Sequence, residues 1–220
     1  MRKDVARLYR VLGERGLIVG SSGNVSGLAA DGASMVITPS GFDPEMGADP
    51  DAGAELVAVG LDGTVLDEGT PSSEWALHAA VYRTCEEARF VVHTHADAST
   101  ALACLNSGLP AFHYMVVQFG GEDVRCAPYV TFGTQALADA AAGAIRGRTA
   151  CLLANHGMIV CAGSAERALS QAVLLETLCR QYLLALSAGT PRLLSPREMD
   201  DARERFKTYG PRSKEPKHES

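Results

Sequence analysis

Two histidines stand one residue apart at the end of a run of β-branched residues, in the segment "RFVVHTHADAST" (89–100). Side chains at positions i and i+2 of a strand point to the same face of a sheet, so His93 and His95 could grip one metal ion. Taken alone the pair is weak support, because two such histidines in a strand are more often structural or exposed. The metal interpretation therefore requires a third ligand from elsewhere in the chain.

Four other histidines compete for that place. His156 lies in "LLANHGMIV", at the tip of an expected hairpin, where Gly157 already supplies the permissive backbone that a turn needs. His78 falls within an expected helix, and His113 in "AFHYM" reads more easily as structural, while His218 is expected to be inert. Three imidazoles that leave one position open are the ligand set of a catalytic zinc ion.

Small hydroxyl and glycine residues form three separate loops, "SSGN" (21–24), "TPSG" (38–41) and "PSSE" (71–74). Such loops aim backbone N–H groups and short hydroxyls at a phosphate. Each loop alone reads as an ordinary turn, which serine and glycine favour anyway. Three of them, together with the carboxylate of Glu74 and the histidines, favour an anion site beside a metal site.

Composition narrows the class of protein. The 220 residues are 46% hydrophobic, enough for one sizeable core, and the net charge of −6 argues against a general nucleic-acid footprint. The N-terminal sequence has no apolar signal core and no run is long enough to span a bilayer. The six cysteines form no C-x-x-C pair, which argues against a closed structural zinc site and favours reduced thiols. We therefore expect a cytoplasmic protein that binds neither nucleic acid nor membrane.

The apolar spacing predicts mixed α and β structure, with a largely antiparallel sheet covered by helices. A hairpin is expected around Asp62-Gly63, and Ser72 or Ser73 is expected to cap a helix that has Glu74 in its first turn. Helices are predicted at 2–15, 70–85, from 97 onward, at 134–146, 165–188 and 195–210, the last ending at Gly210, and residues 211–220 are predicted to be a disordered tail.

Eight motifs, taken in order, resemble the class II aldolase family of L-fuculose-1-phosphate aldolase and L-ribulose-5-phosphate 4-epimerase over about residues 1–210. They are "SGNVS", "ITPSG", "PSSEW", "VVHTHA", "FHYM", "CAPYVTFGT", "NHGMI" and "FKTYG". The resemblance is closest to the fuculose-phosphate aldolase branch, which has glutamate in "PSSEW" where the epimerase branch typically has aspartate. It implies a single α/β domain over 1–210, with α/β/α layers around the sheet.

The resemblance also implies roles for individual residues. His93, His95 and His156 would bind one Zn²⁺ per subunit, and Glu74 would act as the base and ligate the metal when substrate is absent. Tyr114 would reach the site of a neighbouring subunit in a cyclic homotetramer. Tyr209 would close over the aldehyde end of the substrate, and Phe132 would line the aldehyde pocket. The residues expected to hold the substrate phosphate are Asn24, Ser40, Gly41, Ser72 and Ser73.

The implied reaction is the reversible cleavage of a ketose 1-phosphate, such as L-fuculose 1-phosphate, to dihydroxyacetone phosphate and a small aldehyde such as L-lactaldehyde. No Schiff-base lysine is required, and the only lysines are Lys3, Lys207, Lys214 and Lys217. Three other chemistries of the same fold stay open: a pentulose-phosphate 4-epimerase, a methylthioribulose-1-phosphate dehydratase and a sugar-acid phosphate decarboxylase. A non-catalytic domain like the adducin head is a remote alternative, because it predicts lost metal ligands.

Overall fold

A seven-stranded sheet forms the centre of the protein, whose computed structural model describes residues 1–43 and 52–209. Its order is β3-β2-β1-β4-β7-β6-β5, and every neighbouring pair is antiparallel except β5 and β6. The prediction of a largely antiparallel sheet is confirmed. The strands are β1 (Gly23–Leu28), β2 (Ser34–Ile37), β3 (Val57–Gly60), β4 (Phe90–Thr94), β5 (Cys126–Ala127), β6 (Ala150–Leu153) and β7 (Gly157–Ala162).

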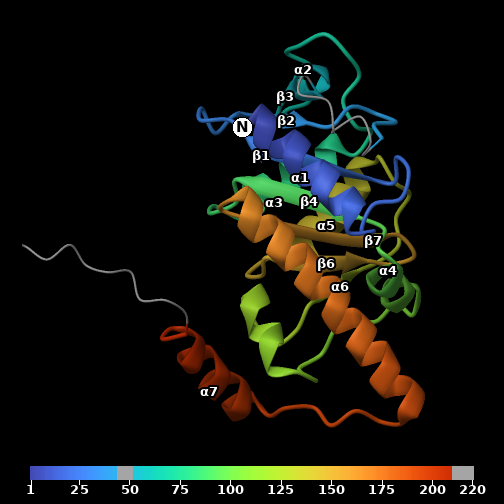
Figure 1. The fold of residues 1–220 in the computed structure, drawn as a ribbon, viewed down its shortest axis with the longest axis vertical. Helices are drawn as coiled ribbons and strands as arrows, with labels where there is room; N and C mark the ends of the chain where they lie inside the picture. The colour runs from blue at the N-terminus through green and yellow to red at the C-terminus, as the bar shows by residue number, and fades with distance from the viewer. Residues whose placement is uncertain (44–51, 210–220) are drawn as a thin grey trace, which may run out of the picture.

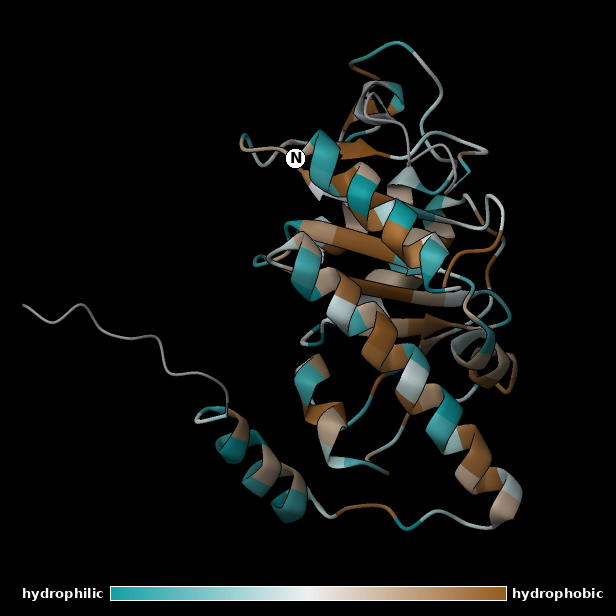
Figure 2. Ribbon diagram, viewed as in Figure 1, coloured by the Kyte–Doolittle hydropathy of each residue, from teal (hydrophilic) through white to brown (hydrophobic). Residues whose placement is uncertain are grey.

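Helices cover both faces of the sheet, which confirms the predicted α/β/α layers. In Figure 1, α1 (Arg2–Glu14) and α6 (Ala165–Ala188) cross in front of the sheet, and they share one apolar core with α4 (Asp97–Cys104). The other face packs on α3 (Trp75–Thr84) and α5 (Gln135–Ile145). Figure 2 shows apolar strands between helices whose polar residues alternate with apolar ones. The remaining helices are α2 (Ala52–Glu55), the 3₁₀ helix η2 (Tyr114–Phe119) and α7 (Pro196–Phe206).

Strand periodicity decides which side chains meet α3. In β4, Val91 packs on the α3 side and Val92 on the α1 side, so His93 points toward α3. The same alternation in β1 turns Asn24 and Ser26 to that side, and Asn24 pairs directly with His93 across the two strands. The polar side chains of two central strands therefore meet beneath the first turns of α3.

Two local predictions need correction, and a third is confirmed in a shorter form. Helix α3 begins at Trp75 with Glu74 as its N-cap, and neither predicted serine caps it, because the Ser72 hydroxyl accepts from the Glu74 N–H (3.3 Å) and closes the turn before the helix. The predicted hairpin around Asp62-Gly63 is present but short, with an antiparallel bridge between Val59 and Val65. Helix α7 ends at Phe206, while the predicted end at Gly210 and the predicted tail 211–220 lie outside the described residues.

Helix α4, which follows His95 directly, is capped by a side chain from a distant helix. Its N-cap residue, Ala96, has no side-chain acceptor. Instead the buried carboxylate of Glu176 on α6 accepts from the N–H groups of Ala98 (2.7 Å) and Ser99 (2.9 Å). A carboxylate at a helix N-terminus satisfies free donors and complements the helix dipole. Glu176 therefore fixes the chain just after His95.

Within the described residues, no helix is both long and apolar enough to cross a membrane.

Replacing Glu176 with alanine should lower the free energy of unfolding by about 2 kcal/mol, because two buried N–H donors lose their acceptor. Urea unfolding at one fixed protein concentration measures this loss. Glu166→Ala, at an exposed position in the first turn of the same helix, is the matched control and should cost less than about 1 kcal/mol. Equal losses in the two variants would contradict the capping role of Glu176.

Candidate active site and metal centre

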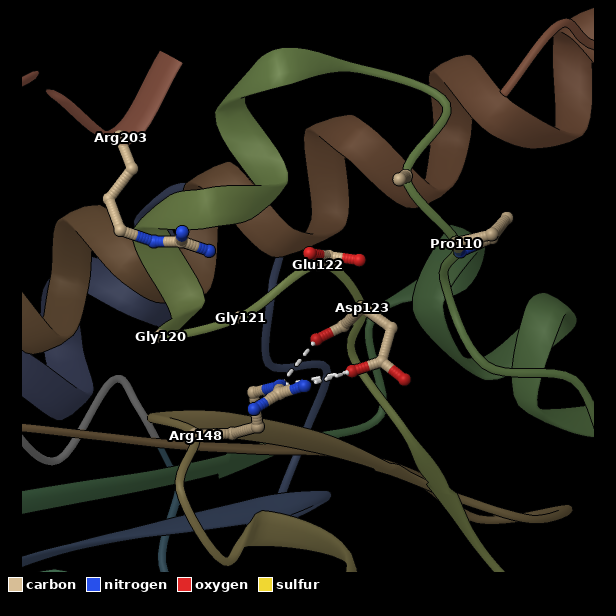
Figure 3. A pocket seen from close by; sticks show the side chains of 8 residues that line it. Pro110, Gly120, Gly121, Glu122, Asp123, Arg148 and Arg203 are labelled. Atoms are coloured by element: carbon tan, nitrogen blue, oxygen red, sulfur yellow. Dashed lines mark hydrogen bonds and ion pairs between the residues drawn. The ribbon is translucent and has the colours of Figure 1, made fainter. Parts of the chain in front are cut away.

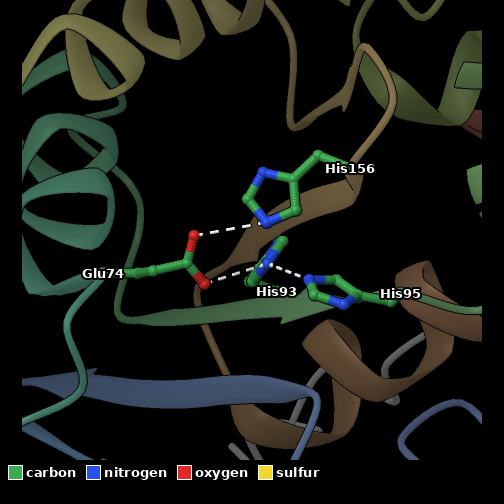
Figure 4. Close-up of side chains that lie close together, drawn as sticks. All are labelled: Glu74, His93, His95 and His156. Atoms are coloured by element: carbon green, nitrogen blue, oxygen red, sulfur yellow. Dashed lines mark hydrogen bonds and ion pairs between the residues drawn. The ribbon is translucent and has the colours of Figure 1, made fainter. Parts of the chain in front are cut away.

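The three predicted histidine ligands and Glu74 converge on one point (Figure 4). Each offers one ligand atom, and these four atoms all lie within 4.8 Å of one another. His93 Nε2 lies 3.0 Å from His95 Nε2 and 3.1 Å from Glu74 Oε2, and His156 Nε2 lies 3.3 Å from Glu74 Oε1. The structure thus brings together four residues that are up to 82 positions apart, from His156 back to Glu74.

His93 is held in one orientation by the backbone. Its Nδ1 lies 2.8 Å from the Met158 carbonyl oxygen of the neighbouring strand. A carbonyl can only accept a hydrogen bond, so Nδ1 must carry a proton and Nε2 is the ring atom that faces the cluster. Hydrogen bonds of this kind fix the tautomer of metal-ligating histidines.

The residue with the left-handed backbone in the turn that carries His156 is not the one that the sequence predicted. Asn155, and not Gly157, has the left-handed backbone, with φ of 54°. Gly157 is needed for a close approach, because a Cβ there would overlap the Thr94 carbonyl oxygen and lie 3.0 Å from His95 Cδ2. The interpretation of Gly157 as the turn residue is therefore wrong. The absence of a side chain lets the β6–β7 tip close against the end of β4.

Burial and charge set the protonation of the cluster. Burial raises the pKa of Glu74, but the charge of His93 and hydrogen bonds from His93 and Asn24 outweigh it and lower that pKa below its usual range. The pKa values of His95 and His156 are each lowered to about 4, by burial first and then by the charge of His93. Burial lowers the pKa of His93, but the charge of Glu74 and the hydrogen bonds to Glu74 and Met158 outweigh it and raise that pKa. Near neutral pH the cluster thus presents a carboxylate and, at His95 and His156, imidazoles with free lone pairs.

This donor set fits a divalent cation. Glu74 Oε1 is buried and has no hydrogen-bond partner among the described residues, although His156 lies at ion-pair distance. Buried polar atoms are normally satisfied, so an orphaned carboxylate oxygen that faces three imidazoles indicates a missing positive charge. Nitrogen and carboxylate oxygen ligands in this number suit zinc.

The three predicted phosphate loops lie next to one another. The Ser40 N–H donates to the Thr70 carbonyl (3.0 Å), and the Ser72 N–H donates to the Thr38 carbonyl (3.1 Å). Thr38 Oγ1 accepts from the N–H of Val25, which follows Asn24. The loop that holds Gly41 and the loop that holds Ser73 are therefore contiguous with the loop before β1. Binding of phosphate by Asn24, Ser40, Gly41, Ser72 and Ser73 stays a prediction.

Asn24 has a partner that sequence reasoning missed. Its side chain is buried, and Nδ2 donates to Glu74 Oε2 over 3.0 Å. The signal in the sequence was indirect, because Asn24 lies two positions before Ser26 on a strand whose polar face is buried.

A pocket of about 290 Å³ opens beside the cluster of Glu74 and the three histidines. It is lined by Glu74, His95 and His156, and Phe132 lies in its wall where the aldehyde end was predicted to bind. Sequence reasoning missed the other lining residues, which are Tyr129, Val130 and Asn155. The aromatic side chains of Tyr129 and Phe132 are mostly exposed, at 61% and 66%, so the wall they form faces outward from the chain.

The two predicted tyrosines do not line this pocket. Tyr114 begins η2, is half exposed and stacks on Phe206, with ring centroids 5.9 Å apart. Tyr209 is 78% exposed and meets the edge of the same Phe206 ring, also at 5.9 Å. Both tyrosines therefore belong to an aromatic group on η2 and α7 rather than to the metal cluster of their own chain.

A second, larger hollow of about 520 Å³ lies between η2, the loop before β5 and α7 (Figure 3). Its two arginines already have acidic partners. Arg148 Nη2 lies 2.6 Å from Asp123 Oδ1, and Arg203 pairs with Asp200. The Arg148–Asp123 pair therefore ties the loop before β5 to the residues that precede β6, and the Arg203–Asp200 pair lies within α7.

Comparison with known proteins settles the family. Residues 3–183 match the class II aldolase and adducin N-terminal domain. The chain belongs to this class II aldolase family. The 5-methylthioribulose-1-phosphate/5-deoxyribulose-1-phosphate aldolase of Rhodospirillum rubrum is 42% identical over 94% of this chain and 90% of the relative. The L-fuculose phosphate aldolase of Escherichia coli is 41% identical over 91% of both chains. A solved L-fuculose 1-phosphate aldolase structure superposes with a TM-score of 0.87 and 37% identity, over 94% of this chain and 95% of that one.

These findings confirm the predicted class II aldolase fold and the prediction of an enzyme of that class. The adducin-like alternative predicted lost ligands, whereas all four cluster residues of this class II aldolase family member are present and converge. The relatives carry different substrate names, so family membership does not fix the sugar phosphate.

Replacing His156 with alanine should remove metal and activity together, since one of three imidazoles would be lost. The loss of affinity should exceed the roughly 10–100-fold that removal of an outer-shell partner costs. Metal analysis after zinc loading and desalting measures it. His113→Ala, whose ring lies outside the cluster, should keep its zinc. Full zinc occupancy in His156→Ala would show that the ligand assignment is wrong.

Proposed function

We propose that the protein is a zinc-dependent aldolase that reversibly cleaves a ketose 1-phosphate to dihydroxyacetone phosphate and a small aldehyde. The observation that carries this proposal is the ionised carboxylate of Glu74 facing three imidazoles at the base of a pocket. His93, His95 and His156 hold one zinc ion per chain. When bound, zinc supplies Lewis-acid stabilisation of the negative charge left on the donor fragment after the C3–C4 bond breaks.

Glu74 acts as the general base. Its Oε2 is occupied by Asn24 and His93, whereas the buried Oε1 keeps a free lone pair. That oxygen takes the proton from carbon 3 of dihydroxyacetone phosphate in the condensation direction and returns it after cleavage. The low pKa of Glu74 keeps the carboxylate ready to accept at neutral pH.

The small-residue loops hold the phosphate. Backbone N–H groups and hydroxyls of the loops at Ser40, Gly41, Ser72 and Ser73 suit a phosphate dianion, and the loops adjoin Glu74 through the turn before α3. Holding the phosphate away from the reacting bond positions carbon 3 against the carboxylate.

The pocket wall favours a substrate with an apolar end. Tyr129, Val130 and Phe132 line the pocket together with Glu74, His95 and His156. We infer that the aldehyde fragment ends in a methyl group, as in L-fuculose 1-phosphate and 5-deoxypentulose 1-phosphates, or in a methylthio group, as in 5-methylthioribulose 1-phosphate. The names of the relatives from Rhodospirillum rubrum and Escherichia coli support this range of substrates.

A panel of ketose 1-phosphates tests the proposed function. Zinc-loaded protein is given L-fuculose 1-phosphate, 5-deoxyribulose 1-phosphate, 5-methylthioribulose 1-phosphate and the hydroxyl-ended fructose 1-phosphate. Release of dihydroxyacetone phosphate is coupled to NADH oxidation. Release from at least one methyl-ended substrate, faster than from fructose 1-phosphate and abolished by a chelator, supports the proposal. An epimer or a dehydrated ketose without dihydroxyacetone phosphate would contradict it and favour another chemistry of the fold.

Glu74→Gln should keep most of its zinc, because the three imidazoles remain, but lose proton exchange. An amide oxygen is too weak a base to remove the carbon 3 proton, so exchange should fall by about 10²-fold or more. The measurement is loss of the pro-chiral proton of dihydroxyacetone phosphate in D₂O, followed by NMR. Wild-type exchange in the variant would rule out the base role.

Tyr114 is proposed to serve the active site of a neighbouring subunit in a cyclic homotetramer, with Tyr209 closing over the aldehyde end. Support comes from exposure, because Tyr114 is half exposed and does not line the pocket of its own chain, whose aromatic wall is open. A cyclic ring would repeat one heterologous interface four times and place one hydroxyl beside each pocket. There Tyr114 protonates or steadies the oxygen on carbon 4.

Mixing two impaired variants tests this role. Glu74→Gln and Tyr114→Phe proteins are combined under conditions that exchange subunits, and exchange is confirmed by mass spectrometry. Interfaces that regain both groups should raise activity above either parent, whereas Tyr114→Phe alone should lower kcat and kcat/KM together. Confirmed exchange without a gain in activity would place Tyr114 in its own chain or outside the chemistry.

A further inference from the structure

A line of buried hydrogen bonds runs from Glu74 along helix α3. Asn24 Nδ2 lies 3.0 Å from Glu74 Oε2, and Asn24 Oδ1 lies 2.5 Å from His78 Nε2. His78 Nδ1 lies 2.7 Å from Ser26 Oγ, which lies 2.8 Å from the Tyr82 hydroxyl. All five side chains are buried, and His78 and Ser26 are fully so.

The elements explain why these groups meet. Glu74, His78 and Tyr82 are spaced four apart, so they form one stripe along α3. Asn24 and Ser26 are spaced two apart on β1 and point to the face that α3 covers. The helical stripe and the strand pair interleave, so Asn24 bridges Glu74 and His78, and Ser26 bridges His78 and Tyr82.

The direction of every bond follows by elimination from the carboxylate. Glu74 can only accept, so the Asn24 amide group donates to it and Asn24 Oδ1 faces His78. That oxygen can only accept, so His78 Nε2 carries the ring proton and Nδ1 accepts from Ser26. Ser26 has spent its one proton, so Tyr82 donates to Ser26 Oγ.

We propose that His78, Ser26 and Tyr82 are positioning residues, which act through Asn24 to hold the Glu74 carboxylate in its catalytic orientation. Each donor in the line points toward Glu74, so the far end at Tyr82 fixes the amide of Asn24. With the amide fixed, Oε2 stays occupied and Oε1 faces the metal cluster and the pocket. This inference rests on the proposed role of Glu74 as the base.

A reversed line would disturb that carboxylate. If His78 carried its proton on Nδ1, its Nε2 would be an acceptor, and the Asn24 amide would turn to donate to it. Asn24 Oδ1 would then lie against Glu74 Oε2, oxygen against oxygen. The Glu74 carboxylate, which can only accept, therefore sets the direction of the line, and Ser26 and Tyr82 complete it by donating along it.

A purely structural role explains the line less well. Burying a histidine and a serine under a helix costs free energy unless every polar atom is paired, and apolar residues would fill the same space at no such cost. Burial also lowers the pKa of His78 to about 3, with the charge of His93 adding to the effect, so the ring stays neutral and keeps one defined tautomer.

The tautomer is measured directly in the folded protein. NMR of protein labelled with ¹⁵N-histidine, with His78 assigned through a His78→Gln variant, should show an Nε2–H ring that does not titrate near neutral pH. This measurement needs neither substrate nor activity, so it tests the line even if the proposed aldolase function fails. An Nδ1–H tautomer in the wild-type protein would overturn the proposal.

Kinetics then test the positioning role. Ser26→Ala should lower solvent exchange of the carbon 3 proton of dihydroxyacetone phosphate about tenfold, a part of the roughly 10²–10⁴-fold that a general base contributes. Tyr82→Phe, which removes only the distal hydroxyl, should lower it less. Zinc content and KM should stay near wild type in both variants, because the metal ligands and phosphate loops are untouched.

Ser99→Ala is the matched control for Ser26→Ala. Its hydroxyl is also fully buried and donates to the Ala96 carbonyl (3.0 Å), but it lies outside the line. It should lose comparable stability and keep wild-type exchange. If Ser26→Ala exchanges protons like Ser99→Ala, or if both lose exchange in proportion to stability, the positioning role is wrong. If Ser26→Ala does not fold, the Tyr82→Phe variant tests the positioning role instead. Wild-type proton exchange in Tyr82→Phe would overturn that role.

Discussion

The buried contact between the Glu74 carboxylate and three imidazoles is the constraint on which the site depends. A carboxylate taken out of water loses its hydration and must recover it from donors or from a cation. Glu74 recovers part of it from Asn24 and His93, and its Oε1 remains without a hydrogen bond among the described residues. A zinc ion at this point would satisfy that oxygen and the three lone pairs together, so the same interaction that builds the site also prepares it for chemistry.

The fold meets this constraint by fixing each contributing segment. β4 is central in the sheet and carries His93 with its tautomer set by the Met158 carbonyl. Gly157 lets the β6–β7 turn close on the end of β4, and Glu176 caps the helix that follows His95. Each of these supports is a contact between segments far apart in the sequence. The site is therefore rigid because the layers on both faces of the sheet hold its ends.

The sequence predicted that Glu74 and the three histidines lie together, but it did not predict the contacts that hold them. His93 and His95 were readable because strand periodicity puts positions i and i+2 on one face, and His156 because a turn tip has no structural need of an imidazole. The supports could not be read in this way, because Asn24, Glu176 and Asn155 are defined by partners that only the tertiary fold brings near. The serine caps of α3 were predicted wrongly because Ser72 bonds the Glu74 N–H in the preceding turn. The stripe of Glu74, His78 and Tyr82 was visible in the sequence, but its meaning depends on Ser26 lying opposite.

Zinc K-edge X-ray absorption of the zinc-loaded protein measures whether Glu74 and the three histidines hold the metal. We expect one zinc per chain with about three imidazole nitrogens and a carboxylate oxygen at roughly 2.0–2.1 Å. In Glu74→Gln the imidazole scattering should persist while the carboxylate contribution is lost. A sulfur shell at roughly 2.3 Å, or a first shell with fewer than three imidazoles, would show that these four residues do not bind zinc together.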